Sequence, residues 1–259
     1  MTSTETRDET TAETDVLLQL TDVRKSYGDK VVLQDIDLTV HAHDVICLIG
    51  SSGSGKSTLL RCLNLLEEID DGVITFDGRE ISDPRVDPRE VRGRIGMVFQ
   101  SYNLFPHLSV LENCTLAPRR VHGVPKGEAE QRARDLLARF GLADQTDKHP
   151  DRMSGGQQQR AALVRALCTQ PTLLLLDEIT AALDPELVGE VLTIVRELAE
   201  QGTTMILATH EMAFAREVAT AVCFLDEGRV LEQGPPAEIF SNPREERTRR
   251  FLARVLPQA

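Results

Sequence analysis

The chain has 259 residues, a formal net charge of -12 and a hydrophobic fraction of 41%. This composition is typical of a globular α/β protein, and the acidic balance argues against general nucleic-acid binding, which needs a basic face. No apolar run is long enough to span a bilayer, and the polar N-terminus lacks the apolar core of a signal peptide. The five cysteines are scattered without a C-x-x-C pair, so we expect neither disulfides nor structural zinc.

The N-terminal third of the chain is dominated by strand patterns. Residues 1–15 are polar and acidic, and we expect a disordered tail there. Short apolar stretches then alternate with turns, of which Asp77-Gly78 is a hairpin signal. The predicted strands are Val16–Ser26, Val31–Leu33, Ile36–Val40, Val45–Ile49, Gly72–Phe76 and Ile95–Phe99.

Between residues 101 and 170 the strand signals disappear. Three helices are predicted, at Leu111–Leu116, Lys126–Phe140 and Gly156–Thr169. Prolines and glycines interrupt the segment and are expected to break these helices, namely Pro118, Gly123, Pro125, Gly141 and Pro150. We interpret this segment as a helical subdomain inserted into an α/β core.

The remaining third returns to alternating strands and helices. The predicted strands are Leu173–Leu176, Thr204–Thr209, Val222–Leu225 and Arg229–Glu232. The predicted helices are Pro185–Glu200, Glu211–Ala219, Pro235–Phe240 and Arg244–Val255.

The most informative motif follows the strand Val45–Ile49. It fits the phosphate-binding pattern G-x-x-x-x-G-K-[ST] and comprises Gly50, Ser51, Ser52, Gly53, Ser54, Gly55, Lys56, Ser57 and Thr58. Its glycines let several backbone N–H groups point at one centre, and the helix start adds to this anion site. Lys56 can reach the terminal phosphates and the Ser57 hydroxyl can bind Mg²⁺. A plain Gly/Ser turn is the alternative, but the strand before the motif and the helix predicted after it, at Thr58–Leu66, argue against it.

Two carboxylates end the apolar strand Leu173–Leu176. In a P-loop protein such a strand presents an acid to Mg²⁺, a role that suits Asp177. Glu178 can take a proton from an attacking water. A surface acidic pair is the alternative, but ligands gather at the carboxyl ends of strands in open α/β sheets.

A second anion site is predicted before the helix Gly156–Thr169. Ser154 is a plausible N-cap, and Gly155, Gly156 and Gln157 follow it at the positive end of the helix dipole. A plain capped loop fits the same residues, so the chemistry alone leaves both readings open.

Three further polar side chains are candidates for contacts with the nucleotide or its metal ion because of their positions. His210 and Gln100 each follow a predicted strand, where His210 can hydrogen-bond a phosphate and Gln100 can contact a metal ion or water. A structural histidine is the alternative for His210. Tyr27 can stack on a purine, although an ordinary edge-strand aromatic is an equal alternative.

Taken together, these motifs resemble the nucleotide-binding subunit of an ATP-binding cassette (ABC) transporter, from Leu17 to Leu256. The most specific match is Ser154–Arg160, which resembles the ABC signature. The resemblance implies a P-loop NTPase (RecA-like) α/β core with an antiparallel β subdomain and an inserted helical subdomain, all within residues 16–259. It assigns adenine stacking to Tyr27, a coupling role and a metal contact to Gln100, and Walker B roles to Asp177 and Glu178. It further identifies Asp184 as part of the D-loop and His210 as the switch histidine.

Two positions depart from the family pattern. Met153 stands where leucine is usual, which conserves volume, and Ile179 stands where proline is usual. The second change puts the backbone geometry of Glu178 in doubt.

A narrower resemblance is to the ATPases of polar amino-acid importers. It is carried by Val98–Leu108, Val110–Asn113, Leu116–Pro118, Phe240–Pro243 and the residues that follow them. It implies an ATP-hydrolysing subunit that acts with ATP and Mg²⁺ at the cytoplasmic face of the membrane. Separate permease subunits and, indirectly, an extracytoplasmic solute-binding protein would complete the importer.

The resemblance also implies a head-to-tail homodimer that forms with ATP. One chain carries two anion sites that its own fold is not expected to join, so each copy can complete the other's site. Three alternatives remain: the ATPase of an exporter or lipoprotein-release system, a soluble ABC ATPase acting on DNA or ribosomes, and a module that binds ATP without turnover. The charge and the single cassette argue against the second, and intact Lys56, Asp177, Glu178 and His210 against the third.

Overall fold

A computed structural model describes residues 16–256 of the chain. The predicted disordered tail at residues 1–15 lies outside the described residues. The strands are β1 (Val16–Tyr27), β2 (Lys30–His41), β3 (Val45–Ile49), β4 (Asp71–Phe76), β5 (Arg79–Glu80), β6 (Ile95–Val98), β7 (Leu173–Asp177), β8 (Met205–Ala208), β9 (Ala221–Asp226) and β10 (Arg229–Gly234). The helices are α1 (Lys56–Leu63), α2 (Pro88–Arg94), α3 (Val110–Arg120), α4 (Lys126–Arg139), α5 (Gly155–Leu167), α6 (Pro185–Glu200), α7 (Met212–Val218), α8 (Pro236–Ser241) and α9 (Glu246–Val255), with 3-10 turns η1 (Ala143–Gln145) and η2 (Pro150–Arg152).

Two sheets organise the strands. A four-stranded antiparallel sheet has the order β2-β1-β4-β5, and a six-stranded sheet has the order β10-β9-β3-β8-β7-β6. In the larger sheet β9, β3, β8, β7 and β6 are parallel, and β10 is antiparallel at one edge. Carboxyl ends of parallel strands lie at one edge of a sheet. The segments that follow β3, β6, β7 and β8 are therefore brought together there.

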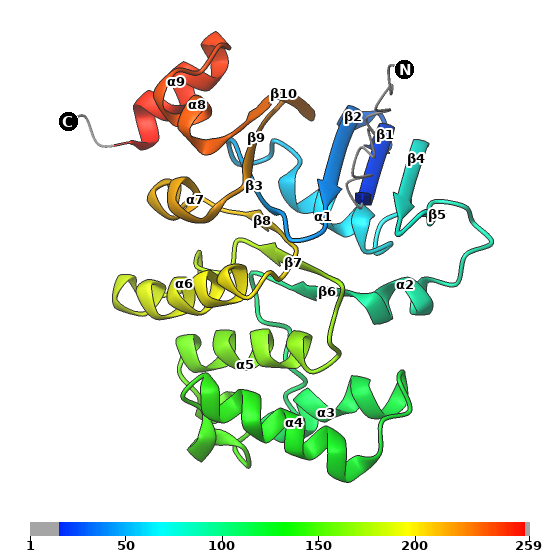
Figure 1. The fold of residues 1–259 in the computed structure, drawn as a ribbon, viewed down its shortest axis with the longest axis vertical. Coiled ribbons are helices and arrows are strands. Elements are labelled where there is room, and N and C mark those ends of the chain that lie inside the picture. The colour runs from blue at the N-terminus through cyan, green and yellow to red at the C-terminus, as the bar shows by residue number, and fades with distance from the viewer. Residues whose placement is uncertain (1–15, 257–259) are drawn as a thin grey trace, which may run out of the picture.

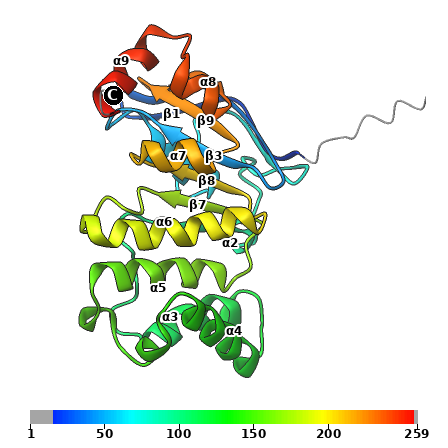
Figure 2. The ribbon, with the colours of Figure 1, turned by 60° about the vertical axis from the view of Figure 1, so that its left-hand side comes forward.

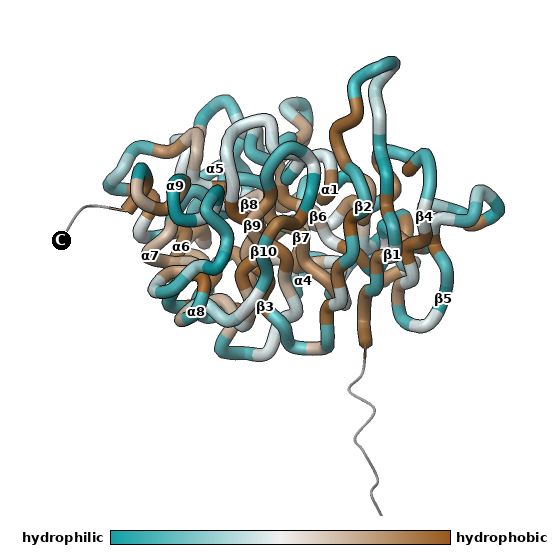
Figure 3. The backbone as a smooth tube through the Cα atoms, turned by 90° about the horizontal axis from the view of Figure 1, so that it is seen from above, coloured by the Kyte–Doolittle hydropathy of each residue, from teal (hydrophilic) through white to brown (hydrophobic). Residues whose placement is uncertain are grey.

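The apolar runs of the central strands form the core because both faces of the larger sheet are covered. In β3, Cys47 and Ile49 belong to one buried cluster, with α5, α6 and α7, whereas Ile46 and Leu48 belong to a second cluster, with α1 and β1. Because both faces of β3 are buried, its residues are all apolar and do not alternate between apolar and polar. Figure 3 shows the hydrophobic residues concentrated in the central strands, with hydrophilic loops around them.

The helices between β6 and β7 gather at one end of the molecule. Figures 1 and 2 show α5 lying between α6 and the pair α3 and α4, away from the four-stranded sheet. The segment 101–170 contains helices and no strand, as predicted. Its treatment as a separate subdomain remains a proposal. Among the described residues, no helix combines the length and the apolar character needed to cross a membrane.

Most predicted elements are confirmed to within a few residues, but three details were wrong. Val31–Leu33 and Ile36–Val40 are one strand, β2, because an irregularity in its pairing with β1 accommodates Asp35, whose φ is 51°. Pro118 does not end its helix: it lies in the last turns of α3, which continues to Arg120. The helix α2 was missed because it is only seven residues long and carries a single apolar residue, Val91, between its first proline and Ile95.

Candidate functional site

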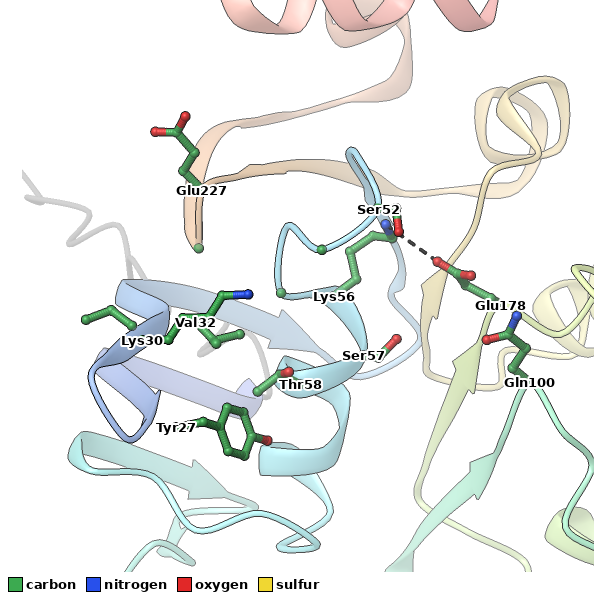
Figure 4. Close-up of a pocket in the computed structure, with 14 residues that line it drawn as sticks. Tyr27, Lys30, Val32, Ser52, Lys56, Ser57, Thr58, Gln100, Glu178 and Glu227 are labelled. Carbon is green, nitrogen blue, oxygen red and sulfur yellow. Dashed lines mark ion pairs between the residues drawn. The ribbon is translucent and has the colours of Figure 1, made fainter.

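A cleft of about 660 Å³ lies beside the P-loop, between the two sheets. Figure 4 shows the side chains that surround it. Among the predicted site residues, those that line it are Tyr27, Ser52, Gly53, Gly55, Lys56, Ser57, Thr58, Gln100 and Glu178. These residues come from β1, from the loop and helix after β3, and from the ends of β6 and β7. The fold thus unites sequence segments that are up to 151 positions apart (178 − 27).

The P-loop adopts the curled backbone that its glycines permit. Gly50, Gly53 and Gly55 have φ values of 148°, 79° and 107°, a region that favours glycine. A Cβ at Gly50 would lie 2.1 Å from the backbone oxygen of Leu225, so no side chain fits there. Gly55 precedes α1, no side chain caps that helix, and its first residues line the cleft, so the N–H groups of its first turn are left for a ligand.

Lys56 is the first residue of α1 and is buried, with 4% of its surface exposed. Its ammonium donates to the carbonyl oxygens of Gly50, at 3.0 Å, and Ser51, at 3.2 Å. Its Nζ also lies 3.6 Å from Oε1 of Glu178, the ion pair drawn in Figure 4. Burial lowers the pKa of Lys56, and the charge of Glu178 opposes that shift.

Ser57 and Asp177 meet beneath the cleft. The Ser57 hydroxyl donates to Oδ1 of Asp177 at 2.7 Å, although Asp177 itself does not line the cleft. Asp177 is 4% exposed, and burial raises the pKa of its carboxyl group, while the hydrogen bond from Ser57 works in the other direction. The pair offers a hydroxyl and a carboxylate as oxygen ligands at one point.

Glu178 is placed by an uncommon backbone conformation at the end of β7. Its φ is 46°, in the left-handed region, and its N–H donates to Ala208 of β8 at 3.0 Å. His210 follows β8, and its Nε2 lies 3.0 Å from Oε1 of Glu178. The carboxylate accepts, so the imidazole is assigned its proton on Nε2 in this contact. Lys56 and His210 therefore both contact the Glu178 carboxylate in the structure. Ile179, the departure beside Glu178, packs its side chain in the core and is 6% exposed.

Tyr27 lies at the open end of the cleft, 45% exposed. Partial burial, followed by the nearby charge of Glu67, raises the pKa of its hydroxyl. The ring stands beside Thr58 at the start of α1 in Figure 4. One face of an aromatic ring is thus available to a ligand that extends from the P-loop toward β1.

The second predicted anion site does not line this cleft. Ser154 caps α5 as expected: its Oγ accepts from Gln157 N at 3.3 Å, and Ser154 N donates to the Gln157 side chain at 3.1 Å. Gly155, Gly156 and Asp184 are likewise absent from the cleft lining. The capped start of α5 therefore lies apart from the P-loop cleft within one chain, and its role as an anion site is a proposal.

Five lining residues were not predicted, namely Lys30, Val31, Val32, Glu227 and Gly228. The hairpin at Glu227 reaches the cleft because Gly228 N donates to Ser54 at 3.2 Å and its carbonyl accepts from Gln34 at 2.8 Å. Its sequence signal, Glu-Gly between two strands, predicts a hairpin and nothing about the hairpin's position. Lys30 and Val31 lie only three and four positions after Tyr27 in the sequence. This closeness to a predicted site residue was the one signal that could have placed them at the cleft.

Comparison with known proteins decides the family. Residues 33–181 match the family described as "ABC transporter". This chain belongs to the ABC transporter family. The match begins on β2 and ends just after Glu178, so it includes the P-loop, the signature segment and the acidic strand end.

Relatives of this ABC family chain match along nearly its whole length. It is 51% identical to the glutamine transport ATP-binding protein GlnQ of Geobacillus stearothermophilus, over 90% of this chain and 97% of that protein. It is 49% identical to the general L-amino acid transport ATP-binding protein AapP of Rhizobium johnstonii, over 95% of this chain and 96% of that protein.

Solved ABC structures confirm the predicted fold class. The structure of cbiO1 from Clostridium perfringens, part of the ABC transporter complex cbiONQ, matches with a TM-score of 0.79 and 32% identity, over 88% of this chain and 92% of that one. A dimeric structure of the ATP-binding cassette MJ0796 in a post-hydrolysis state, bound to ADP and Pi, matches with a TM-score of 0.77 and 30% identity, over 85% of this chain and 99% of that one.

Proposed function

We propose that this chain is the ATP-hydrolysing subunit of an ABC importer, which energises uptake of a polar amino acid through separate membrane permease subunits. The observation that carries the proposal is the near-full-length similarity to amino-acid transport ATP-binding proteins. The cleft geometry supports the enzymatic part, because it joins a P-loop lysine, a buried aspartate and a strand-end glutamate.

The phosphates of ATP fit the P-loop end of the cleft. Backbone N–H groups from Gly53 to Thr58 would bind the phosphate oxygens, and Lys56 would pair with the terminal phosphates. Tyr27 would stack on the adenine at the other end. The Glu178 carboxylate would accept a proton from the attacking water as the new O–P bond forms, and ADP would leave with the electrons of the broken P–O bond.

Ser57 and Asp177 have the donors that Mg²⁺ prefers. This ion usually keeps several waters and takes one or two carboxylates together with substrate phosphates. No group of three or more His, Cys, Asp or Glu side chains fit to hold a metal occurs within residues 16–256, so the remaining ligands would be phosphate oxygens, water and the amide of Gln100. When bound, Mg²⁺ would offset the negative charge of the phosphates. His210 would hold Glu178 through Nε2 in the nucleotide-free cleft and would donate this hydrogen bond to the terminal phosphate once ATP is bound.

A second copy of the chain would complete each site. Ser154, Gly155, Gly156 and Gln157 form a capped helix start that lies outside the chain's own cleft. In a head-to-tail dimer this helix start would face the phosphates held by the other copy, with Asp184 nearby, and ATP would hold the two copies together. The dimeric structure of the similar cassette MJ0796, bound to ADP and Pi, supports the formation of a dimer.

The membrane partners follow from the same family. We place the chain at the cytoplasmic face of the cell membrane, bound peripherally to integral permease subunits through its helical region after Gln100. An extracytoplasmic solute-binding protein would deliver the amino acid to the permease and would not touch this chain. Nucleic acid is not expected as a partner, given the net charge of -12.

Amino-acid uptake by cells that lack this chain tests the proposal. Labelled glutamine, glutamate, asparagine, aspartate and arginine are supplied singly, and we expect uptake of at least one to fall to background. The wild-type chain should restore it, and Lys56→Ala should not. Arg79→Ala is the control, because its side chain is 60% exposed on β5 in a surface pair with Glu90, outside both the cleft and the helical region. Unchanged uptake of all five amino acids in the deletion strain would contradict the proposed function.

A further inference from the structure

The hydroxyl of Tyr102 lies where three segments of one subunit meet. It donates to the carbonyl oxygen of Ala182, at 3.2 Å, in the turn 180–184. A Cβ built at Gly155 would lie 3.1 Å from the same hydroxyl and 3.9 Å from the oxygen of Ala182. A side chain two residues after Gln100 therefore contacts both the start of α5 and the turn that follows Glu178.

The backbone that carries this side chain is itself unusual. Tyr102 and Asn103 have φ values of 61° and 51°, two consecutive non-glycine residues in the left-handed region. Such a conformation persists when its surroundings hold it. The Arg165 guanidinium supplies the restraint, because it donates to the carbonyl oxygen of Tyr102 at 3.0 Å and to that of Asn103.

Arg165 belongs to α5, so it fixes this backbone to the same helix that begins at Gly155. Burial lowers the pKa of Arg165. Its polar partners in the structure are the two carbonyl oxygens, which match the planar fork of an arginine. The position of the segment 101–103 therefore depends on α5 at two places, through Arg165 and through Tyr102 at Gly155.

These contacts connect two surfaces with different proposed roles. Gln100 lines the subunit's own cleft, whereas Ser154–Gly156 would face the nucleotide held by the other copy. We propose that Tyr102, held by Arg165, is a positioning residue that makes the segment after Gln100, the start of α5 and the turn 180–184 move as one unit. This inference rests on the proposed ATP-dependent dimer. It means that filling a subunit's own cleft also places the helix start that the other site needs.

Tyr102→Phe tests the link because it removes only the hydroxyl. The substitution is made in a Glu178→Gln parent, and dimer formation is followed by light scattering against ATP concentration. We expect the ATP concentration for half-dimerisation to rise about fivefold, the effect of losing one ordinary hydrogen bond. ATP affinity of the monomer should stay within error of the parent, and the unfolding temperature should fall by no more than the roughly 2–4 °C expected when one hydrogen bond is lost from a protein of this size. Arg165→Lys, which keeps the charge and loses the fork, should weaken dimerisation in the same direction.

Thr169→Val is the matched control. Its hydroxyl donates to the carbonyl oxygen of Ala166 at 2.7 Å, beyond the opposite end of α5, so the same kind of bond is removed far from Gly155. We expect dimerisation to remain that of the parent. An equal weakening by Thr169→Val, or no weakening by Tyr102→Phe, would overturn the proposal.

Hydrogen exchange tests the link without nucleotide or dimer. In the nucleotide-free protein, Tyr102→Phe should reduce protection together in peptides covering residues 100–104, 154–160 and 180–184, and Thr169→Val should not. Loss of protection confined to residues 100–104 would overturn the proposal. If the Glu178→Gln parent fails to dimerise with ATP, the head-to-tail arrangement is wrong, and the exchange measurement still decides whether Tyr102 joins the three segments.

Discussion

The Nζ atom of Lys56 lies 3.6 Å from Oε1 of Glu178, and the two side chains are 3% and 18% exposed. The ammonium that would bind the terminal phosphates of ATP is thus paired with the carboxylate that would accept the water's proton. Phosphate oxygens that enter the cleft must compete with Glu178 for this ammonium. Nucleotide binding would therefore release the Glu178 carboxylate from its ion pair with Lys56.

Glu178→Gln separates nucleotide binding from hydrolysis. Glutamine keeps the shape and an accepting oxygen but cannot take a proton, so turnover should fall by about 10²–10⁴, the usual contribution of a positioned base. Lys56, Ser57 and Asp177 remain, so Mg·ATP should still bind and hold two copies together. Phosphate release measures the first effect, and light scattering with ATP or ADP measures the second; ADP should support no dimer.

Glu200→Gln is the control for this prediction, since Glu200 is an exposed glutamate at the end of α6. It should hydrolyse ATP at the wild-type rate. If Glu178→Gln also hydrolyses ATP normally, the base lies elsewhere, and the backbone at Ile179 is the first place to look.

Ser154→Arg, added to Glu178→Gln, should abolish the ATP-dependent dimer. An arginine would block the capped start of α5, which is assigned to the nucleotide of the other copy, while the chain's own cleft is untouched. ATP binding to the monomer, measured by calorimetry, should remain. Ser241→Arg, an exposed serine at the end of α8, is the control and should leave the dimer intact. A double mutant that dimerises as well as Glu178→Gln would refute the head-to-tail arrangement.

Asp177→Asn should stabilise the nucleotide-free protein at neutral pH. Burial raises the pKa of Asp177 in the folded state, so the fold loses stability as pH rises through the range above the carboxyl's ordinary pKa, and that loss persists at neutral pH. Asparagine removes the charge and can still accept the bond from Ser57. We expect the unfolding temperature to rise by roughly 2–4 °C, the shift that about 1 kcal/mol produces in a protein of this size.

The same variant should lose the Mg²⁺-dependent part of stabilisation by ATP. Differential scanning fluorimetry with ATP, with and without Mg²⁺, measures both effects. Asp144→Asn, at an exposed position in η1, should change neither. A lower unfolding temperature for Asp177→Asn without nucleotide would show that the carboxylate stabilises the fold.

Gly228→Ala should destabilise the protein more than Gly78→Ala. Both glycines have positive φ, 79° and 72°, so alanine is strained at either position. A Cβ at Gly228 would also lie 2.4 Å from the carbonyl oxygen of Val32, whereas nothing lies within 4 Å of one at Gly78. The clash should add about 1–3 kcal/mol to the cost of Gly228→Ala. Urea unfolding of both variants measures the difference, and equal losses would contradict the close packing of the hairpin against β2.

Local sequence determined the parts of this protein that depend on neighbours along the chain. The P-loop was readable because its glycines, lysine and serine must be adjacent to curl one backbone around a phosphate. Strands β3 and β7 were readable because burial on both faces requires uninterrupted apolar residues, and Ser154 was readable as a helix cap because the capping partner is three residues away.

Tertiary structure decided everything that joins distant segments. The 3.0 Å contact of His210 with Glu178 depends on β7 and β8 being neighbours in the sheet, and the cleft position of Glu227 depends on Gly228 packing against Val32. Likewise, Tyr102 reads in sequence as one residue of a loop, yet its hydroxyl lies between Gly155 and Ala182. Contacts of this kind leave no periodicity or spacing along the chain, because each is set by how whole elements pack against one another.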